Sequence, residues 1–133
     1  MSKSSEQVYE DQWGAILDRP GYVEIRWYDT TRGMAWEDFQ KFLITFTEVV
    51  ERNRRPGALV DATSFQMDMS LMRNDWRDEQ IIPRYNGAGM RKFAFHMPAG
   101  MPAIGAPPEP EGPANFPTAY FGTRQDALEW LLN

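Results

Sequence analysis

The stretch from residue 70 to residue 97 limits the possible folds most, because it combines a helix, a glycine stop and a buried strand. Its first half has helical spacing after a plausible N-cap at Ser70, with the positions Leu71, Met72, Asp75, Trp76, Glu79 and Ile82. Gly87 and Gly89 can end that helix. The second half alternates like a strand, with one face made of Phe93, Phe95 and Met97. Such a unit is stable only when further strands and helices cover it.

The elements predicted around this stretch belong to a small mixed sheet. Two strands joined by an Asp-Arg-Pro-Gly turn predict an antiparallel hairpin, and a helix with a continuous apolar stripe follows. In order, we expect strands at 13–17 and 22–28, a helix at 35–53, a buried strand at 58–62, a helix at 70–88, strands at 91–97 and 118–122, and a final helix capped by Thr123. Pro83 cannot donate a hydrogen bond to Glu79, so we expect helix 70–88 to kink or split there.

This order predicts a single α/β domain over residues 1–133. Its two-layer mixed sheet has an N-terminal hairpin, then a parallel βαβαβ unit, with helices mainly on one face. Residues 1–10 are expected to be a loose N-terminus. Residues 98–117 hold seven of the ten prolines and are expected to form a long Pro/Gly-rich loop that acts as a lid or an interface arm, or is mobile. The second sheet face then needs cover from the C-terminal helix, from this loop or from a second subunit.

Composition excludes several functions. With no cysteine, the chain has no disulfide, no thiol nucleophile and no thiolate metal site. The net charge of −5 disfavours nucleic acid and anionic membranes as partners. The polar N-terminus and the lack of a long apolar run predict a soluble cytoplasmic protein. No Gly-x-Gly-x-x-Gly motif or P-loop is present, and we predict no cofactor.

Two titratable residues lie at predicted strand ends. Asp61 ends a buried parallel strand, where ligands of open α/β sheets gather, so it can bind a ligand or take a proton; alternatively it caps the next loop or pairs with Arg77. His96 is the only histidine, which rules out a histidine-rich metal site; it is a packed strand residue or, alternatively, a base.

Arginines and aromatic residues give two further candidates. Arg73, Arg77, Gln80 and Arg84 recur at helical spacing and, with Arg32, Arg91 and Lys92, can hold a carboxylate or phosphate; alternatively they pair with Asp75, Asp78 and Glu79 on a solvated face. The residues Trp27, Tyr28, Trp36, Trp76 and Tyr85 line an apolar pocket or pack in the core.

Several segments carry a family resemblance. RWYDTTRGM, PGALVDAT, WRDEQIIPRYNGAGMRKFAFHMP, EGPANFPTAYF and the ending RQDALEWL resemble an uncharacterised branch of the STAS-like small bacterial α/β proteins, over most of residues 13–132. A weaker similarity is to orphan proteins on mobile gene cassettes. The resemblance implies a STAS-like fold. Anti-sigma-factor antagonists of this group carry a phosphorylatable serine after the strand matching 58–62. Thr63 and Ser64 lie there, but the family's Asp-Ser-Ser-Gly pattern is absent, which argues against a phospho-switch.

Two functional hypotheses follow. The first is a non-catalytic binding or interaction protein that acts as a homodimer and can have a further protein partner. It rests on the uncovered sheet face, the proline-rich loop and the lack of a catalytic constellation. The dimer is also favoured by a surplus of aromatic residues on or near strands: Trp13, Tyr22, Tyr28, Tyr120 and Phe121. The second is a site for a small anionic ligand, or an enzyme site, at the strand carboxyl ends. Its candidate residues are Trp36, Asp61, Arg77, Arg84, Tyr85 and His96, with no metal and no assigned catalytic residue.

Overall fold

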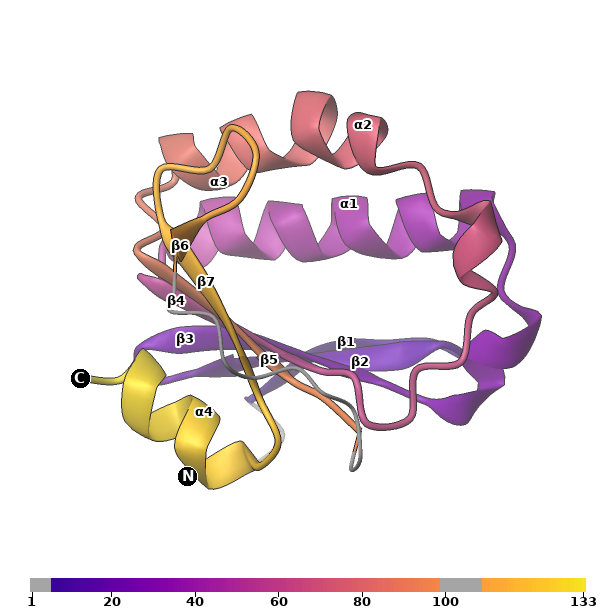
Figure 1. Cartoon of the computed structure of the whole chain (residues 1–133), viewed down its shortest axis with the longest axis horizontal. Coiled ribbons are helices and arrows are strands. Elements are labelled where there is room, and N and C mark those ends of the chain that lie inside the picture. The colour runs from indigo at the N-terminus through magenta and orange to yellow at the C-terminus, as the bar shows by residue number, and fades with distance from the viewer. Residues whose placement is uncertain (1–5, 99–108) are drawn as a thin grey trace.

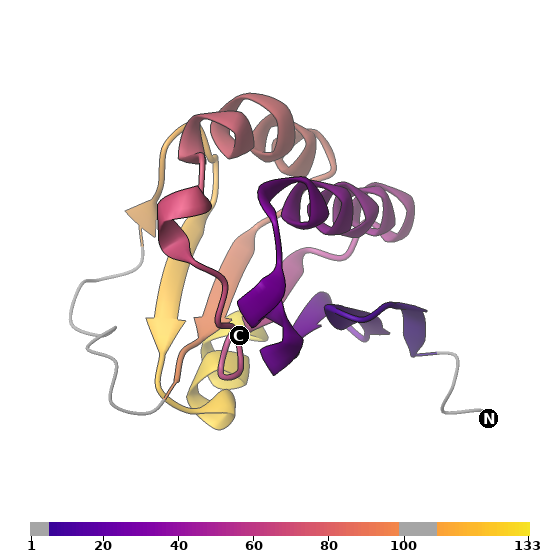
Figure 2. The same ribbon diagram turned by 90° about the vertical axis from the view of Figure 1, so that its right-hand side faces the viewer.

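A computed structural model describes residues 6–98 and 109–133, which form a seven-stranded mixed sheet in the order β1-β2-β3-β4-β5-β7-β6 (Figure 1). The strands are β1 (Gln7–Glu10), β2 (Gly14–Arg19), β3 (Tyr22–Trp27), β4 (Gly57–Asp61), β5 (Lys92–His96), β6 (Glu109–Pro110) and β7 (Pro117–Phe121). On one face lie α1 (Trp36–Asn53), α2 (Asn74–Trp76) and α3 (Ile82–Gly87), and on the other lies α4 (Arg124–Leu131) (Figures 1 and 2). The predicted mixed α/β class is confirmed.

The first three strands are antiparallel. β2 and β3 form the predicted hairpin, and its turn ends at Gly21, whose positive φ of 90° suits glycine. β1 pairs with β2 at the sheet edge, so the expectation of a loose N-terminus is wrong for residues 7–10, while residues 1–5 lie outside the described part. This strand has no clear apolar pattern in the sequence, because Gln7 and Glu10 are exposed and the strand is held by backbone pairing with β2.

The next strands are parallel, and their registers align residues across the sheet. Ile25 lies beside Val60, Val60 beside Phe95, and Phe95 beside Tyr120. One position further along each strand, the row contains Arg26, Asp61, His96 and Phe121. Because side chains alternate along a strand, these two rows point to opposite faces of the sheet.

Helix α1 covers the first face, as its apolar stripe predicts. The residues Phe39, Phe42, Leu43, Phe46, Val49 and Val50 are all buried in the main core. The Asp38 carboxylate accepts a hydrogen bond of 3.0 Å from the Ala35 N–H at the first turn. The helix ends where Arg54 adopts a left-handed conformation with φ of 52°.

The predicted helix 70–88 is wrong in its start, whereas the expected break near Pro83 is present. A short 3₁₀ turn spans Met69–Leu71, where Asp68 accepts hydrogen bonds from the Ser70 N–H and hydroxyl, so Ser70 caps no long helix. The helix starts at Asn74, and Arg77–Ile81 form a π turn in which the Ile82 N–H donates to the Arg77 carbonyl. The break precedes Pro83 because proline has no N–H to continue the α-helical ladder.

Helix α4 covers the centre of the second face. Ala127 and Leu131 pack on Tyr22, Leu59 and Ala94, and the Thr123 hydroxyl accepts a hydrogen bond from the Asp126 N–H at the predicted cap. The sequence allowed three covers for this face: the C-terminal helix, the long loop or a second subunit. The structure shows that the C-terminal helix packs there. This removes the uncovered sheet face as an argument for a dimer.

The region predicted as a long loop contains strand residues near its end. Glu109 and Pro110 form β6, which pairs with β7, and Pro117 already belongs to β7. Residues 99–108 lie outside the described part, and with them Met101 and Ile104. Among the helices that the structure describes, none is long and apolar enough to cross a membrane.

Candidate functional site: an apolar cavity at the strand ends

A cavity of about 260 Å³ lies between the sheet and its helices, at the carboxyl ends of β3, β4 and β5. The sheet contributes the aligned row Ile25, Val60, Phe95 and Tyr120, together with Trp27, Ala62, Phe93 and Met97. Strand carboxyl ends are the usual ligand position in open α/β sheets. The fold therefore places its cavity where a binding site is expected.

The other walls come from the helices and from the connection between β4 and α2. Phe39 and Leu43 are four residues apart on the buried face of α1. Phe65, Met69 and Met72 come from the connection, and the Phe65 ring lies 5.1 Å from that of Trp27. Aromatic rings and flexible methionines make a wall that can adjust to an apolar ligand.

Three polar side chains are among the described cavity residues: Arg77, Tyr85 and Tyr120. Burial raises the pKa of Tyr85 to about 12, although the Arg77 charge acts in the opposite direction. Burial and a hydrogen bond to Glu111 raise the pKa of Tyr120 to about 12, again against the Arg77 charge. Both hydroxyls are therefore protonated at neutral pH, and the Arg77 charge is close to both.

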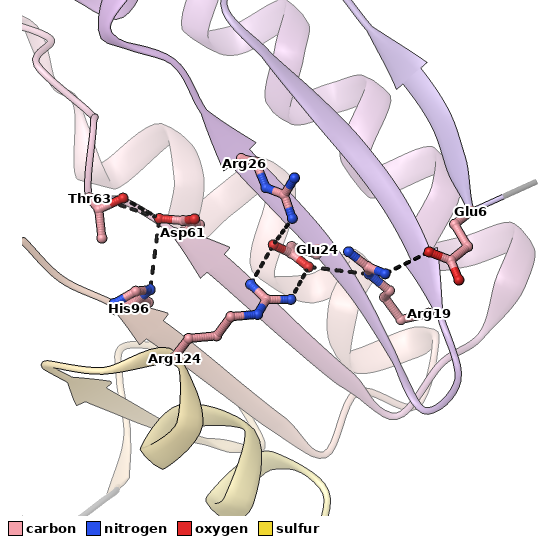
Figure 3. A network of polar contacts seen from close by, with 8 residues as sticks. All are labelled: Glu6, Arg19, Glu24, Arg26, Asp61, Thr63, His96 and Arg124. Carbon is pink, nitrogen blue, oxygen red and sulfur yellow. Dashed lines mark hydrogen bonds and ion pairs between the residues drawn. The ribbon is translucent and has the colours of Figure 1, made fainter. Parts of the chain in front are cut away.

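A second group of polar residues lies on the opposite sheet face, around Glu24 of β3 (Figure 3). The Glu24 side chain is 0% exposed and accepts two hydrogen bonds of 2.8 Å from Arg124. Arg26 donates a third, of 3.3 Å, and the Nε of Arg19 lies 3.4 Å from the carboxylate without hydrogen-bond geometry. Arg19 also donates to Glu6 over 2.6 Å.

The charges of this cluster determine the protonation of Glu24. Burial acts to raise the pKa of Glu24, but the hydrogen bonds and charge of Arg124 and the charges of Arg26 and Arg19 outweigh it, and the pKa falls below its usual value. The bond to Glu24 in turn raises the pKa of Arg124. The cluster thus favours the charged form of Glu24, and the Glu24–Arg124 ion pair within it ties α4 to β3.

Asp61 and His96 lie beside this cluster rather than in the cavity (Figure 3). Asp61 accepts hydrogen bonds from the Thr63 N–H over 3.1 Å and from the Thr63 hydroxyl over 2.7 Å. Of the roles that the sequence predicts for Asp61, this is the capping of the following loop. The His96 Nδ1 is 3.9 Å from the Asp61 carboxylate, too far for a hydrogen bond, and no described residue bonds to this buried atom.

The hypothesis that Asp61, Arg77, Tyr85 and His96 converge is wrong. Val60 and Ala62 point into the cavity, so Asp61 between them points to the other face, and His96 between Phe95 and Met97 does the same. Arg77 and Tyr85 both line the cavity, on the helix side of the sheet.

The two remaining candidates lie outside the cavity. Arg84 donates two hydrogen bonds, of 2.9 and 2.6 Å, to Glu51 of α1. The Trp36 ring stacks at 5.7 Å on Phe39 and meets the edge of Trp76 at 5.5 Å, so both tryptophans cover the core edge. Of the predicted aromatic pocket, Trp27 and Tyr85 line the cavity.

The sequence interpretation missed Glu24 and Arg124 entirely. A glutamate on the polar face of a half-buried strand is normally exposed, and only the position of α4 makes Glu24 buried. It also missed Tyr120 as a cavity residue, although its alternation with Ala119 and Phe121 places it on the same face as Phe95.

Within residues 6–98 and 109–133, no three metal-ligating side chains gather into a group. Comparisons with protein-family models, with curated proteins and with solved structures give no match for this chain.

Proposed function

We propose that this protein is a non-catalytic binding protein that takes up one small, largely apolar molecule in the cavity. The observation that carries the proposal is the cavity itself, about 260 Å³ of mainly apolar space at the carboxyl ends of parallel strands. A cavity of roughly 150 Å³ lined by apolar side chains can hold benzene. This cavity therefore has room for an aromatic ring that carries a short side chain.

The lining residues support binding rather than catalysis. Among the described residues that line the cavity, the polar ones are one arginine and two tyrosines, without a carboxylate or histidine to act as a general base. Both tyrosine hydroxyls are held protonated by their raised pKa values. The titratable pair His96 and Asp61 is on the other side of the sheet.

A titration with indole, a small neutral aromatic probe, tests the proposal. We expect saturable binding, seen as chemical-shift changes of cavity residues such as Phe95 and Met97, with intermolecular nuclear Overhauser effects to the same side chains. Ala62→Leu fills the cavity and should weaken indole binding strongly. Ala35→Leu is the matched control, because it adds the same side chain at an exposed position outside the cavity.

The proposal would be contradicted by absence of saturable indole binding to the wild type, or by undiminished binding to a folded Ala62→Leu variant. The Overhauser effects need no variant, so they locate the probe even if Ala62→Leu fails to fold. Effects only to residues outside the cavity would also contradict it.

The homodimer and the STAS-like assignment remain part of this proposal. The order of strands and helices supports a STAS-like fold. Two exposed apolar residues support an interaction surface: Met69 of the cavity wall, 61% exposed, and Leu71, two residues further along the chain, 42% exposed. The net charge of −5 supports the prediction that nucleic acid is not a partner.

A further inference from the structure

Arg77 lies between the apolar cavity and a second, polar pocket. It is the first residue of the π turn Arg77–Ile81, and its half-buried side chain lines both spaces. The outer pocket, of about 340 Å³, also contains Asp78, Glu111 and Tyr120. π turns inside helices occur frequently at functional sites. The position of Arg77 therefore gives the cavity one charged group at its boundary.

No acidic side chain of the described residues forms an ion pair with Arg77. Residues 1–5 and 99–108 contain no Asp or Glu. By contrast, Arg84, two helical turns later, is paired with Glu51. Arg77 is thus a cation without a carboxylate partner of its own.

The acidic side chains of the outer pocket form no ion pair with Arg77. The Glu111 carboxylate accepts hydrogen bonds of 2.8 and 3.1 Å from the Tyr120 hydroxyl. Asp78 is exposed and lies against the backbone of Gly112, where an added Cβ would be 3.0 Å from its carboxylate. Water screens charges at such exposed positions, whereas a charge facing an apolar cavity acts in a lower dielectric.

The chemistry of a ligand follows from these surroundings. A guanidinium binds a carboxylate with two parallel hydrogen bonds, and partial burial strengthens them. The rings of Trp27, Phe39, Phe65, Phe93 and Phe95 favour an aromatic partner in edge or offset contacts. We propose that the cavity ligand is a small aromatic monocarboxylate, with its ring in the cavity and its carboxylate bound by Arg77. This rests on the proposed function, because it names the ligand class for the same cavity.

Matched probes test this assignment. They are 3-phenylpropionate, its neutral amide and the corresponding amine, 3-phenylpropylamine, each titrated by calorimetry into the full chain. We expect the carboxylate to bind about tenfold or more tightly than the amide, as hydrogen bonds to a charged group imply. In Arg77→Gln this ratio should fall to about one. In the control Arg84→Gln it should stay unchanged, because Arg84 is outside the cavity.

The result that overturns the inference is equal binding of carboxylate and amide, or a ratio that survives in Arg77→Gln. Tighter binding of the amine would also overturn it, because Asp78 and Glu111 would then dominate. If Arg77→Gln does not fold, the Nε–H resonance of Arg77 in the wild-type protein is monitored during each titration instead. A chemical-shift change with the carboxylate but not with the amide supports the inference. No change with the carboxylate refutes it. Cavity binding of the amide without charge preference would leave the proposed function intact, whereas no binding of any probe would refute both.

Discussion

Arg124, the first residue of α4, donates two hydrogen bonds of 2.8 Å to Glu24, which is fully buried in the middle of β3. The two residues are 100 positions apart in the sequence. This pair joins the last helix to a central strand, and a charge buried in this way depends on its partner.

We predict that Glu24→Gln lowers the free energy of unfolding by about 1.5–3 kcal/mol, because the buried side chain loses its charged hydrogen bonds to Arg124, which is itself only partly exposed. Urea denaturation at neutral pH measures the loss. The double variant Glu24→Leu with Arg124→Met should recover part of it, since both charges are then removed. A matched control is Glu51→Gln, whose pair with Arg84 is exposed and should cost less than about 1 kcal/mol. Similar losses at both positions would contradict the buried pair.

The lowered pKa of Glu24 predicts how stability depends on acid. In the unfolded chain this carboxyl has its ordinary pKa, 4.5, and in the folded protein a lower one. The unfolded state therefore binds more protons as the pH falls, so the stabilisation is present above about pH 4.5 and is lost below it. Urea denaturation between about pH 5 and pH 3 should show a steeper loss for the wild type than for Glu24→Gln. Parallel pH profiles would show that Glu24 does not contribute.

Two neighbouring phenylalanines on β5 should differ in their importance for stability. Phe93 is buried among Tyr85 and Phe116, so Phe93→Ala should cost about 3–5 kcal/mol. Phe95 is only half-buried and borders the existing cavity, so Phe95→Ala should cost less, about 1–3 kcal/mol. Chemical denaturation of both variants measures the difference. A loss below about 1 kcal/mol for Phe93→Ala would mean that the strand faces the other way.

The homodimer is tested most directly by mass. Light scattering at micromolar concentration should give about twice the chain mass, as expected for a two-fold pair. Deleting residues 100–112 should weaken the dimer if this segment, with Met101 and Ile104, packs on the second subunit. A clean monomer would exclude the dimer, and an unchanged dimer after deletion would exclude the role of the segment.

Much of the fold could be predicted because it depends on local patterns. The apolar stripe of α1, the hairpin of β2 and β3, the buried strand β4 and the Thr123 cap are all visible within a few residues of sequence. The break near Pro83 was also expected, because a missing N–H is a property of the residue itself. The π turn that places Arg77 was not, because a helix can respond to proline in several ways.

The candidate site was only partly predictable. Alternation along β4 and β5 places Asp61 and His96 on the face opposite the cavity. The strand sequences therefore already indicated that these two residues do not converge with Arg77 and Tyr85. Other features depend on contacts between distant residues: the aligned row from Ile25 to Tyr120, and the burial of Glu24 through Arg124. Sequence periodicity by itself determined which residues share a face. Only the tertiary structure decided which faces meet, because strand register and the docking of α4 are set by packing across the whole chain.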